Sequence, residues 1–177
     1  IQQGEELGFE FLHARRAMAH KSFVARIARA DGDLARLQRV ERSRKALVAR
    51  RHWQLASAIA CFERAARRFR SEADETLKRV CVHALHEKAA LLSKACVDEH
   101  LDARTKDEAK AAMLRTLDDA IGLCKTGGDW AARAARPLYR ARLQALFGRP
   151  GDRERPPLPR ARAQVFAWVD ELGAHFP

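Results

Sequence analysis

Apolar side chains recur every three to five residues over most of the chain, the spacing typical of amphipathic helices. The first such stretch covers residues 5–30, and a second runs from about residue 34 to residue 70. Asp31-Gly32-Asp33 separates them, because glycine readily ends a helix and aspartate caps the start of the next. The second stretch contains no glycine or proline, so it predicts either one long helix or two helices joined near Arg51-His52.

Two further helices are predicted in the middle of the chain. Ser71 is followed by acidic residues, which indicates a capped helix start, and the apolar stripe then continues to about Leu101. Thr105 opens a second capping pattern, and its helix is expected to end at Gly127-Gly128.

The C-terminal third combines one predicted helix with a region rich in proline, which interrupts helices. Asp129 is expected to cap a helix in which Pro137 predicts a kink or a fresh start. Residues 149–159 are rich in proline and arginine, which predicts an extended linker. A short apolar pattern over residues 160–177 predicts a last helix that packs on the domain or on a partner.

These patterns together predict an all-α fold. No segment alternates with a period of two for long enough to indicate a strand. We expect antiparallel helical hairpins that form an elongated bundle or an irregular α-solenoid. One helical domain is expected over residues 1–148, followed by the linker and the last helix.

The charge of the chain is unevenly distributed. Of 177 residues, 34 are basic and 23 acidic, which gives a formal net charge of +11, and residues 1–70 hold 16 basic and 7 acidic side chains. Such a field favours nucleic acid, an acidic protein or an anionic membrane face as a partner. The 26 arginines and 34 alanines also fit a GC-rich genome, so composition alone does not select a partner.

A run of arginines over residues 36–70 is the strongest feature that core packing does not explain. One interpretation is a solvated helix face, and the other is a binding face for an anionic partner, with RNA backbone ahead of DNA or membrane. No base-reading module is present, so any nucleic-acid contact would be made to phosphates. The candidate residues are Arg36, Arg39, Arg42, Arg50, Arg64, Arg67, Arg68 and Arg70.

A short segment at residues 58–65 reads Ala-Ile-Ala-Cys-Phe-Glu-Arg-Ala. Its Ala-x3-Phe-x2-Ala spacing resembles the second helix of a tetratricopeptide repeat. That resemblance implies stacked helical hairpins and a concave groove for a peptide or a partner protein. A helical bundle of another kind, or an irregular solenoid, is the alternative.

No constellation of residues predicts catalysis. His83 and His86, and likewise Cys96 and His100, have the spacing of paired ligands on a helix, but a closed zinc site needs four convergent ligands. No nucleophile motif and no glycine-rich phosphate loop are present. We therefore expect a protein that is not an enzyme and that has no cofactor, no metal and no small-molecule substrate.

Location and partners follow from the same features. No apolar run approaches the roughly 18–20 residues of a membrane span. Four cysteines within helical patterns indicate a reducing, intracellular compartment, which is the cytoplasm or an organelle if a targeting segment was removed. We expect a non-catalytic scaffold or adaptor that binds other proteins of a complex. The alternative is a basic subunit that contacts RNA in a ribonucleoprotein such as an organellar ribosome.

Overall fold

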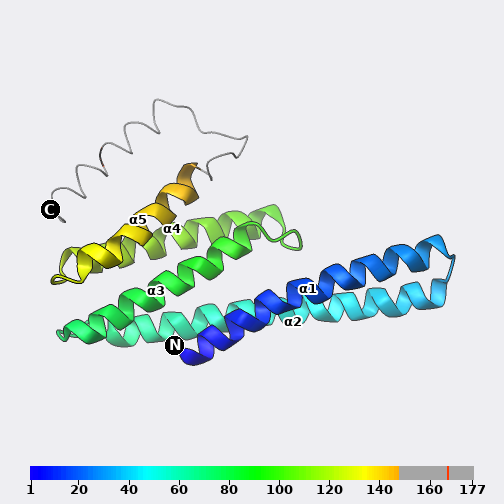
Figure 1. Ribbon diagram of the computed structural model, residues 1–177, viewed down its shortest axis with the longest axis horizontal. Coiled ribbons are helices and arrows are strands. Elements are labelled where there is room, and N and C mark those ends of the chain that lie inside the picture. The colour runs from blue at the N-terminus through cyan, green and yellow to red at the C-terminus, as the bar shows by residue number, and fades with distance from the viewer. Residues whose placement is uncertain (148–166, 168–177) are drawn as a thin grey trace. The chain divides into compact units, whose positions relative to one another are not determined.

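The computed structural model describes residues 1–147 and Ala167, and it contains no strand among them, which confirms the predicted all-α fold. The helices are α1 (Gln2–Ala30), α2 (Leu34–Phe69), α3 (Glu75–Cys96), α4 (Ala103–Lys125) and α5 (Ala131–Phe147) (Figure 1). They fall into two units, Ile1–Phe62 and the chain from Glu63 onward. The predicted linker at 149–159 and the helix expected within 160–177 lie outside the described residues, apart from the helical Ala167.

The second apolar stretch forms one continuous helix of 36 residues, not two. Arg51, where a turn was an alternative, lies inside α2 and is buried. The start of α2 is capped as expected, because the Arg36 backbone N–H donates to Asp33 Oδ1 at 2.8 Å. Gly32 in the preceding turn has a φ of 69°, which a residue with a side chain rarely adopts.

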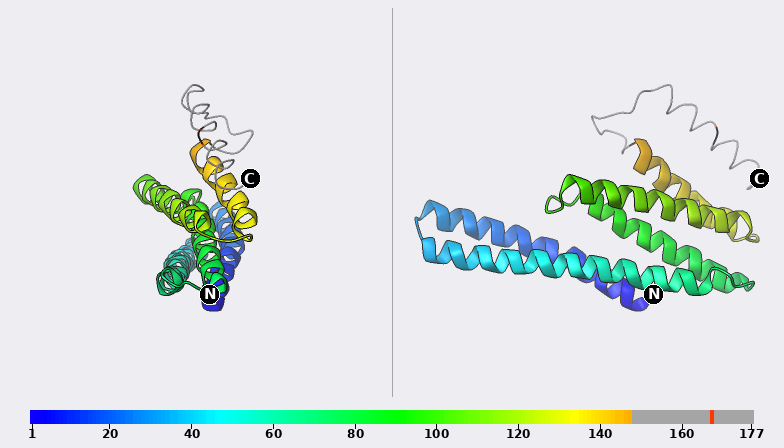
Figure 2. Two further views of the ribbon diagram at one scale, coloured as in Figure 1. Left: turned by 90° about the vertical axis from the view of Figure 1, so that its left-hand side faces the viewer. Right: turned by 180° about the vertical axis from the view of Figure 1, so that it is seen from behind.

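In the first unit, α1 and the part of α2 up to Phe62 lie side by side and antiparallel (Figure 2). Gln54 donates to Glu10 at 2.5 Å, and near the turn Arg29 lies 3.9 Å from Glu41. The core between the two helices is made of apolar side chains less than 9% exposed: Phe11, Met18, Ala25, Ala28, Val40, Leu55, Ala58, Cys61 and Phe62.

Two aromatic residues within the two predicted apolar stretches are exposed. Phe23 is 53% exposed because it follows buried Met18 by five residues, which rotates it by about 140° around the helix axis. Trp53 is 62% exposed because it precedes buried Phe62 by nine residues, about half a rotation away. Both rings therefore lie on the outer sides of their helices.

In the second unit, α3, α4 and α5 pack in sequence, α4 against α3 and α5 against α4 (Figure 1). Because each connection reverses the chain direction, α3 and α5 run the same way. Leu117 of α4 and Leu138 of α5 are almost fully enclosed, at 0% and 1% exposure. Arg70 joins the end of α2 to α4 through a 3.0 Å contact with Asp119.

Helix caps in the second unit differ from the sequence-based expectation. Asp74, not Ser71, caps α3, and its side chain accepts from the N–H groups of Thr76 and Leu77. The α3 helix ends at Cys96, before Leu101. Asp102, not Thr105, caps α4. In each case an aspartate with extended backbone stands directly before the first helical residue, which places its carboxylate on the free N–H groups.

The last described helix begins at Ala131, two residues after Asp129. Pro137 lies inside α5, which continues to Phe147. No described helix is both long enough and apolar enough to cross a membrane.

Candidate interaction surfaces

The eight candidate arginines are all exposed, but they divide between the two units. The first unit holds Arg36, Arg39, Arg42 and Arg50, and the second holds Arg64, Arg67, Arg68 and Arg70. The structure therefore gives two basic segments of α2, each described within its own unit.

Several of these arginines contact acidic side chains of the same chain. Arg50 lies 4.0 Å from Glu10, and Arg67 lies 3.3 Å from Glu63. Such exposed pairs contribute about 0–1 kcal/mol to stability, but they neutralise part of the local charge. By contrast, within the described residues no carboxylate lies within 4 Å of the guanidinium groups of Arg36, Arg39 and Arg42. These three keep their charge available.

The outer face of α2 in the first unit combines arginine with tryptophan. Arg39, Arg42, Arg50 and Trp53 have the spacing i, i+3, i+11 and i+14, which places them within about 80° of one another around the helix axis. The opposite side of α2 carries buried Leu55 and Phe62 and packs toward α1. We call these four residues the Arg–Trp face.

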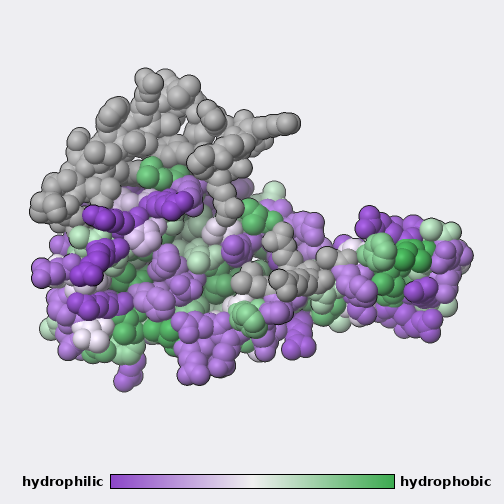
Figure 3. Space-filling model, viewed as in Figure 1, coloured by the Kyte–Doolittle hydropathy of each residue, from purple (hydrophilic) through white to green (hydrophobic). Residues whose placement is uncertain are grey.

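The outer face of α1 is aromatic and apolar. Phe9, His13, Phe23 and Ile27 have the spacing i, i+4, i+14 and i+18, again within about 80°. Phe9 is 64% exposed, and its ring lies 4.3 Å from that of His13. In Figure 3, hydrophobic surface is visible at the end of the hairpin that carries its turn. We call these four residues the aromatic face.

Sequence reasoning missed the aromatic face because it followed one drifting apolar stripe along α1. A strict rotation of 100° per residue separates two stripes, one through Phe11 and Met18 and the other through Phe9 and Phe23. The aromatic stripe on α1 could therefore have been found from the sequence alone.

A groove lies between α3 and α5 in the second unit, with a volume of about 540 Å³. One face of α3 forms the first wall with Arg79, Val82, His83 and His86. The start and first turns of α5 form the other wall with Asp129, Trp130, Arg133, Ala134, Pro137 and Leu138. The groove was not predicted from the sequence, because its walls come from segments about fifty residues apart.

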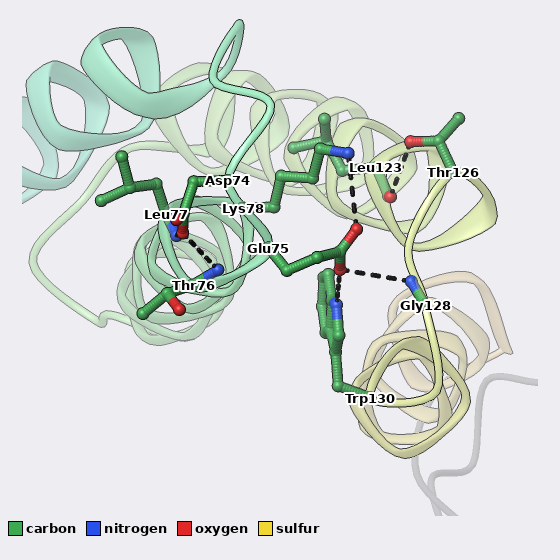
Figure 4. A network of polar contacts seen from close by, with 9 residues as sticks. All are labelled: Asp74, Glu75, Thr76, Leu77, Lys78, Leu123, Thr126, Gly128 and Trp130. Carbon is green, nitrogen blue, oxygen red and sulfur yellow. Dashed lines mark hydrogen bonds and ion pairs between the residues drawn. The ribbon is translucent and has the colours of Figure 1, made fainter.

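Trp130 is held in the groove wall by a carboxylate (Figure 4). Glu75 of α3 accepts a hydrogen bond from Trp130 Nε1 and another, of 3.3 Å, from the Gly128 backbone N–H. The Lys78 ammonium lies 3.6 Å from the same carboxylate. The bond from Trp130, then that from Gly128, hold the pKa of Glu75 below its ordinary value.

Two arginines line the groove. The Arg79 guanidinium lies 5.6 Å from the centre of the Trp130 ring, a cation–π geometry. Both Arg79 and Arg133 are exposed, and neither has a carboxylate within 4 Å in the part of the chain that the structure describes.

The histidine and cysteine pairs occupy different places. His83 and His86 both line the groove. Cys96 and His100 do not share a helix, because α3 ends at Cys96, which corrects the expected i, i+4 pair. Among the described residues no group of three or more metal-ligating side chains comes together.

Residues 58–65 lie within α2, where Ala58 and Phe62 are buried in the first unit. No family model, no curated protein and no solved structure matches the chain. The resemblance of residues 58–65 to a tetratricopeptide repeat therefore stays a prediction.

Proposed function

We propose that this protein is a non-catalytic helical scaffold that binds other proteins of a larger assembly through the outer faces of its α1–α2 hairpin. One observation carries the proposal. Phe9, Phe23 and Trp53 are 64%, 53% and 62% exposed, on helix faces that point away from the hairpin core. Exposed aromatic side chains grouped on such faces are typical of partner-binding surfaces.

The Arg–Trp face indicates the chemistry of one partner. Tryptophan and arginine are the residues that most often dominate binding energy at protein interfaces. Arg39 and Arg42 have no carboxylate neighbour among the described residues, so a partner supplies the opposite charge. We infer a protein surface with an apolar centre for Trp53 and carboxylates around it.

The compartment proposed for this assembly is a reducing one. The four cysteines of the described region, Cys61, Cys81, Cys96 and Cys124, form no disulfide. Mostly buried cysteines outside disulfides support an intracellular setting.

RNA is the second candidate partner, and the same face supports it. Proteins that bind single-stranded nucleic acid combine arginines along the backbone with aromatic rings on which bases stack. Arg36, Arg39 and Arg42 with Trp53 have that composition. In this alternative the protein is a subunit of a ribonucleoprotein.

The test of the scaffold proposal is the recovery of a defined partner set by the tagged full chain. Partners that co-elute in size-exclusion chromatography are identified by mass spectrometry for the wild type, for Trp53→Ser and for Phe9→Ser/Phe23→Ser. We expect at least one face variant to lose the same proteins by about tenfold or more. Val97→Ser is the matched control, because Val97 is 73% exposed but lies in the second unit. An unchanged partner set in both face variants contradicts the proposal.

A binding assay with RNA separates the two candidates. If the scaffold proposal holds, single-stranded RNA binds negligibly at about 150 mM salt, where charges are screened beyond ~8 Å. Tight binding that Arg36→Glu/Arg39→Glu/Arg42→Glu abolishes, with a salt slope reduced by roughly 0.7 per lost contact, selects RNA instead.

A further inference from the structure

We propose that the groove between α3 and α5 binds an acidic segment of a partner protein, with an apolar side chain against Ala134 and Pro137 and carboxylates on Arg79 and Arg133. This inference deepens the proposed scaffold function, because it adds a second site in the other unit and gives the chemistry of its ligand. It uses none of the residues of the aromatic face or the Arg–Trp face.

The size and form of the groove fit an extended ligand. Its volume of about 540 Å³ lies within the roughly 300–1,000 Å³ typical of binding sites. The residues of the α3 wall, from Arg79 to His86, follow one another at i, i+3, i+4 and i+7, and so cover two helical turns. The α5 wall, from Trp130 to Leu138, covers a similar length. A ligand that follows both walls is about 10 Å long or more, which suits several residues of a peptide better than one small ion.

The groove also divides chemically into two parts. Val82, Ala134, Pro137 and Leu138 provide an apolar lining beside the ring of Trp130. The guanidinium groups of Arg79 and Arg133 supply fixed positive charge, and guanidinium pairs with carboxylates through two parallel hydrogen bonds. Trp130 is pre-oriented, since Glu75 holds its Nε1. A ligand with an apolar side chain flanked by carboxylates satisfies both parts at once.

Charge and the apolar lining favour this ligand over a second copy of the chain and over a free phosphate. A second copy of the chain would bring a further net charge of +11 toward the groove, which repulsion opposes. A free phosphate would occupy only the charged part of the groove and would leave its apolar lining without a partner.

The test is a selection of peptides of roughly 12 residues displayed on phage against the intact chain, followed by anisotropy measurements with the selected peptides made synthetically. We expect selected sequences to place two or more acidic residues beside a large apolar one. The dissociation constant should rise at least about tenfold in Arg79→Glu/Arg133→Glu. Ala134→Trp, which fills the groove without a charge change, should weaken binding to a similar degree.

Matched controls keep this result interpretable. Arg115→Glu/Arg136→Glu makes the same charge change at exposed arginines that do not line the groove, and it should alter binding less than about twofold. Circular dichroism and thermal unfolding show whether each variant is folded, and Arg79→Gln/Arg133→Gln replaces the glutamate variant if that one is not. Trp53→Ser should bind the peptides with wild-type affinity. The experiment therefore tests the groove separately from the proposed binding by the hairpin faces.

Three results overturn the inference. The first is a selection that yields no acidic peptides, and the second is an equal loss of binding in the control pair. The third is displacement of the peptides by millimolar inorganic phosphate that itself depends on Arg79 and Arg133, which would make the groove a small-anion site.

Discussion

Gly4 of α1 lies directly against the ring of Phe62 in α2. A Cβ atom placed on Gly4 would meet Cε2 and Cζ of that ring at 3.0 Å and the Cβ of Cys61 at 3.3 Å. Phe62 is 1% exposed, so its ring has little space to move. The two helices approach closely here because position 4 lacks a side chain.

Gly4→Ala should therefore destabilise the protein despite the higher helix propensity of alanine. The propensity gain of about 0.5–1 kcal/mol is opposed by an overpacking cost of roughly 1–3 kcal/mol. We expect a net loss of about 1 kcal/mol in denaturant unfolding. In a Phe62→Leu background, which removes the two nearest ring atoms, the same change should become neutral or stabilising. Equal effects in both backgrounds would show that the contact does not control packing.

Phe62→Ala should lower the free energy of unfolding by about 3–5 kcal/mol, because it leaves a large cavity between α1 and α2. Urea unfolding followed by circular dichroism measures this change. Phe69→Ala in the same helix is the control, since Phe69 is only half-buried and should cost less. A cost below about 1 kcal/mol for Phe62→Ala would mean that this side of α2 is not core.

Truncation of two nearby residues on α2 should change the stability of the protein by very different amounts. Trp53 is 62% exposed, and Trp53→Ala should change stability by no more than about 0.5 kcal/mol. Leu55, two residues later, is 7% exposed, and Leu55→Ala should cost about 2–5 kcal/mol. Thermal unfolding of both variants measures the two changes in stability. A large loss for Trp53→Ala would show that its ring is packed.

Acidic pH should weaken the contact between α3 and the start of α5 and lower the stability of the protein. In the folded protein the pKa of Glu75 lies below its ordinary value of 4.5. The bonds of its carboxylate therefore contribute their full stabilisation of the folded state above about pH 4.5. That contribution is lost as the pH falls through the lowered pKa. We expect the melting temperature to fall below pH 4.5, and to fall less in Glu75→Gln. Glu72→Gln, an exposed change nearby, should leave the acid dependence as in the wild type.

The thiols should react in a defined order. Burial raises the pKa of Cys124 to about 11, and its side chain is fully enclosed. At pH 8 about one such thiol in a thousand is ionised, whereas the thiolate is the reactive form. Cys96 is only half-buried, so iodoacetamide should modify Cys96 first and Cys124 only after unfolding. Peptide mass spectrometry reports the order, and equal native rates would contradict this assignment.

Helix identity could be predicted from the sequence, because it depends on local spacing. Asp33 was recognisable as a cap, and the continuous pattern without glycine or proline allowed α2 to be one helix. Sequence could not decide the continuity at Arg51, because nothing local shows that its guanidinium lies 4.6 Å from the Phe11 ring, buried between two helices.

The candidate sites were less accessible to sequence reasoning. The exposed arginines could be named, but their ion pairs with Glu10 and Asp119 depend on residues forty or more positions away. The α3–α5 groove needs the packing of both helices on α4, and that arrangement has no sequence signature. The orientation of Trp130 in the groove wall depends on Glu75 of another helix.

The short turn at Gly32 also restricts how the length of this hairpin can change. The contact of Gly4 with Phe62 is set by residue counts measured from the turn along each helix. One residue inserted within either helix would rotate everything beyond it by about 100° and turn one of the two contacting positions outward. Insertions of seven residues nearly restore the rotation, to within about 20°. In relatives of this chain, length differences in α1 and in the matching part of α2 should therefore come as paired heptads or fall at the turn itself.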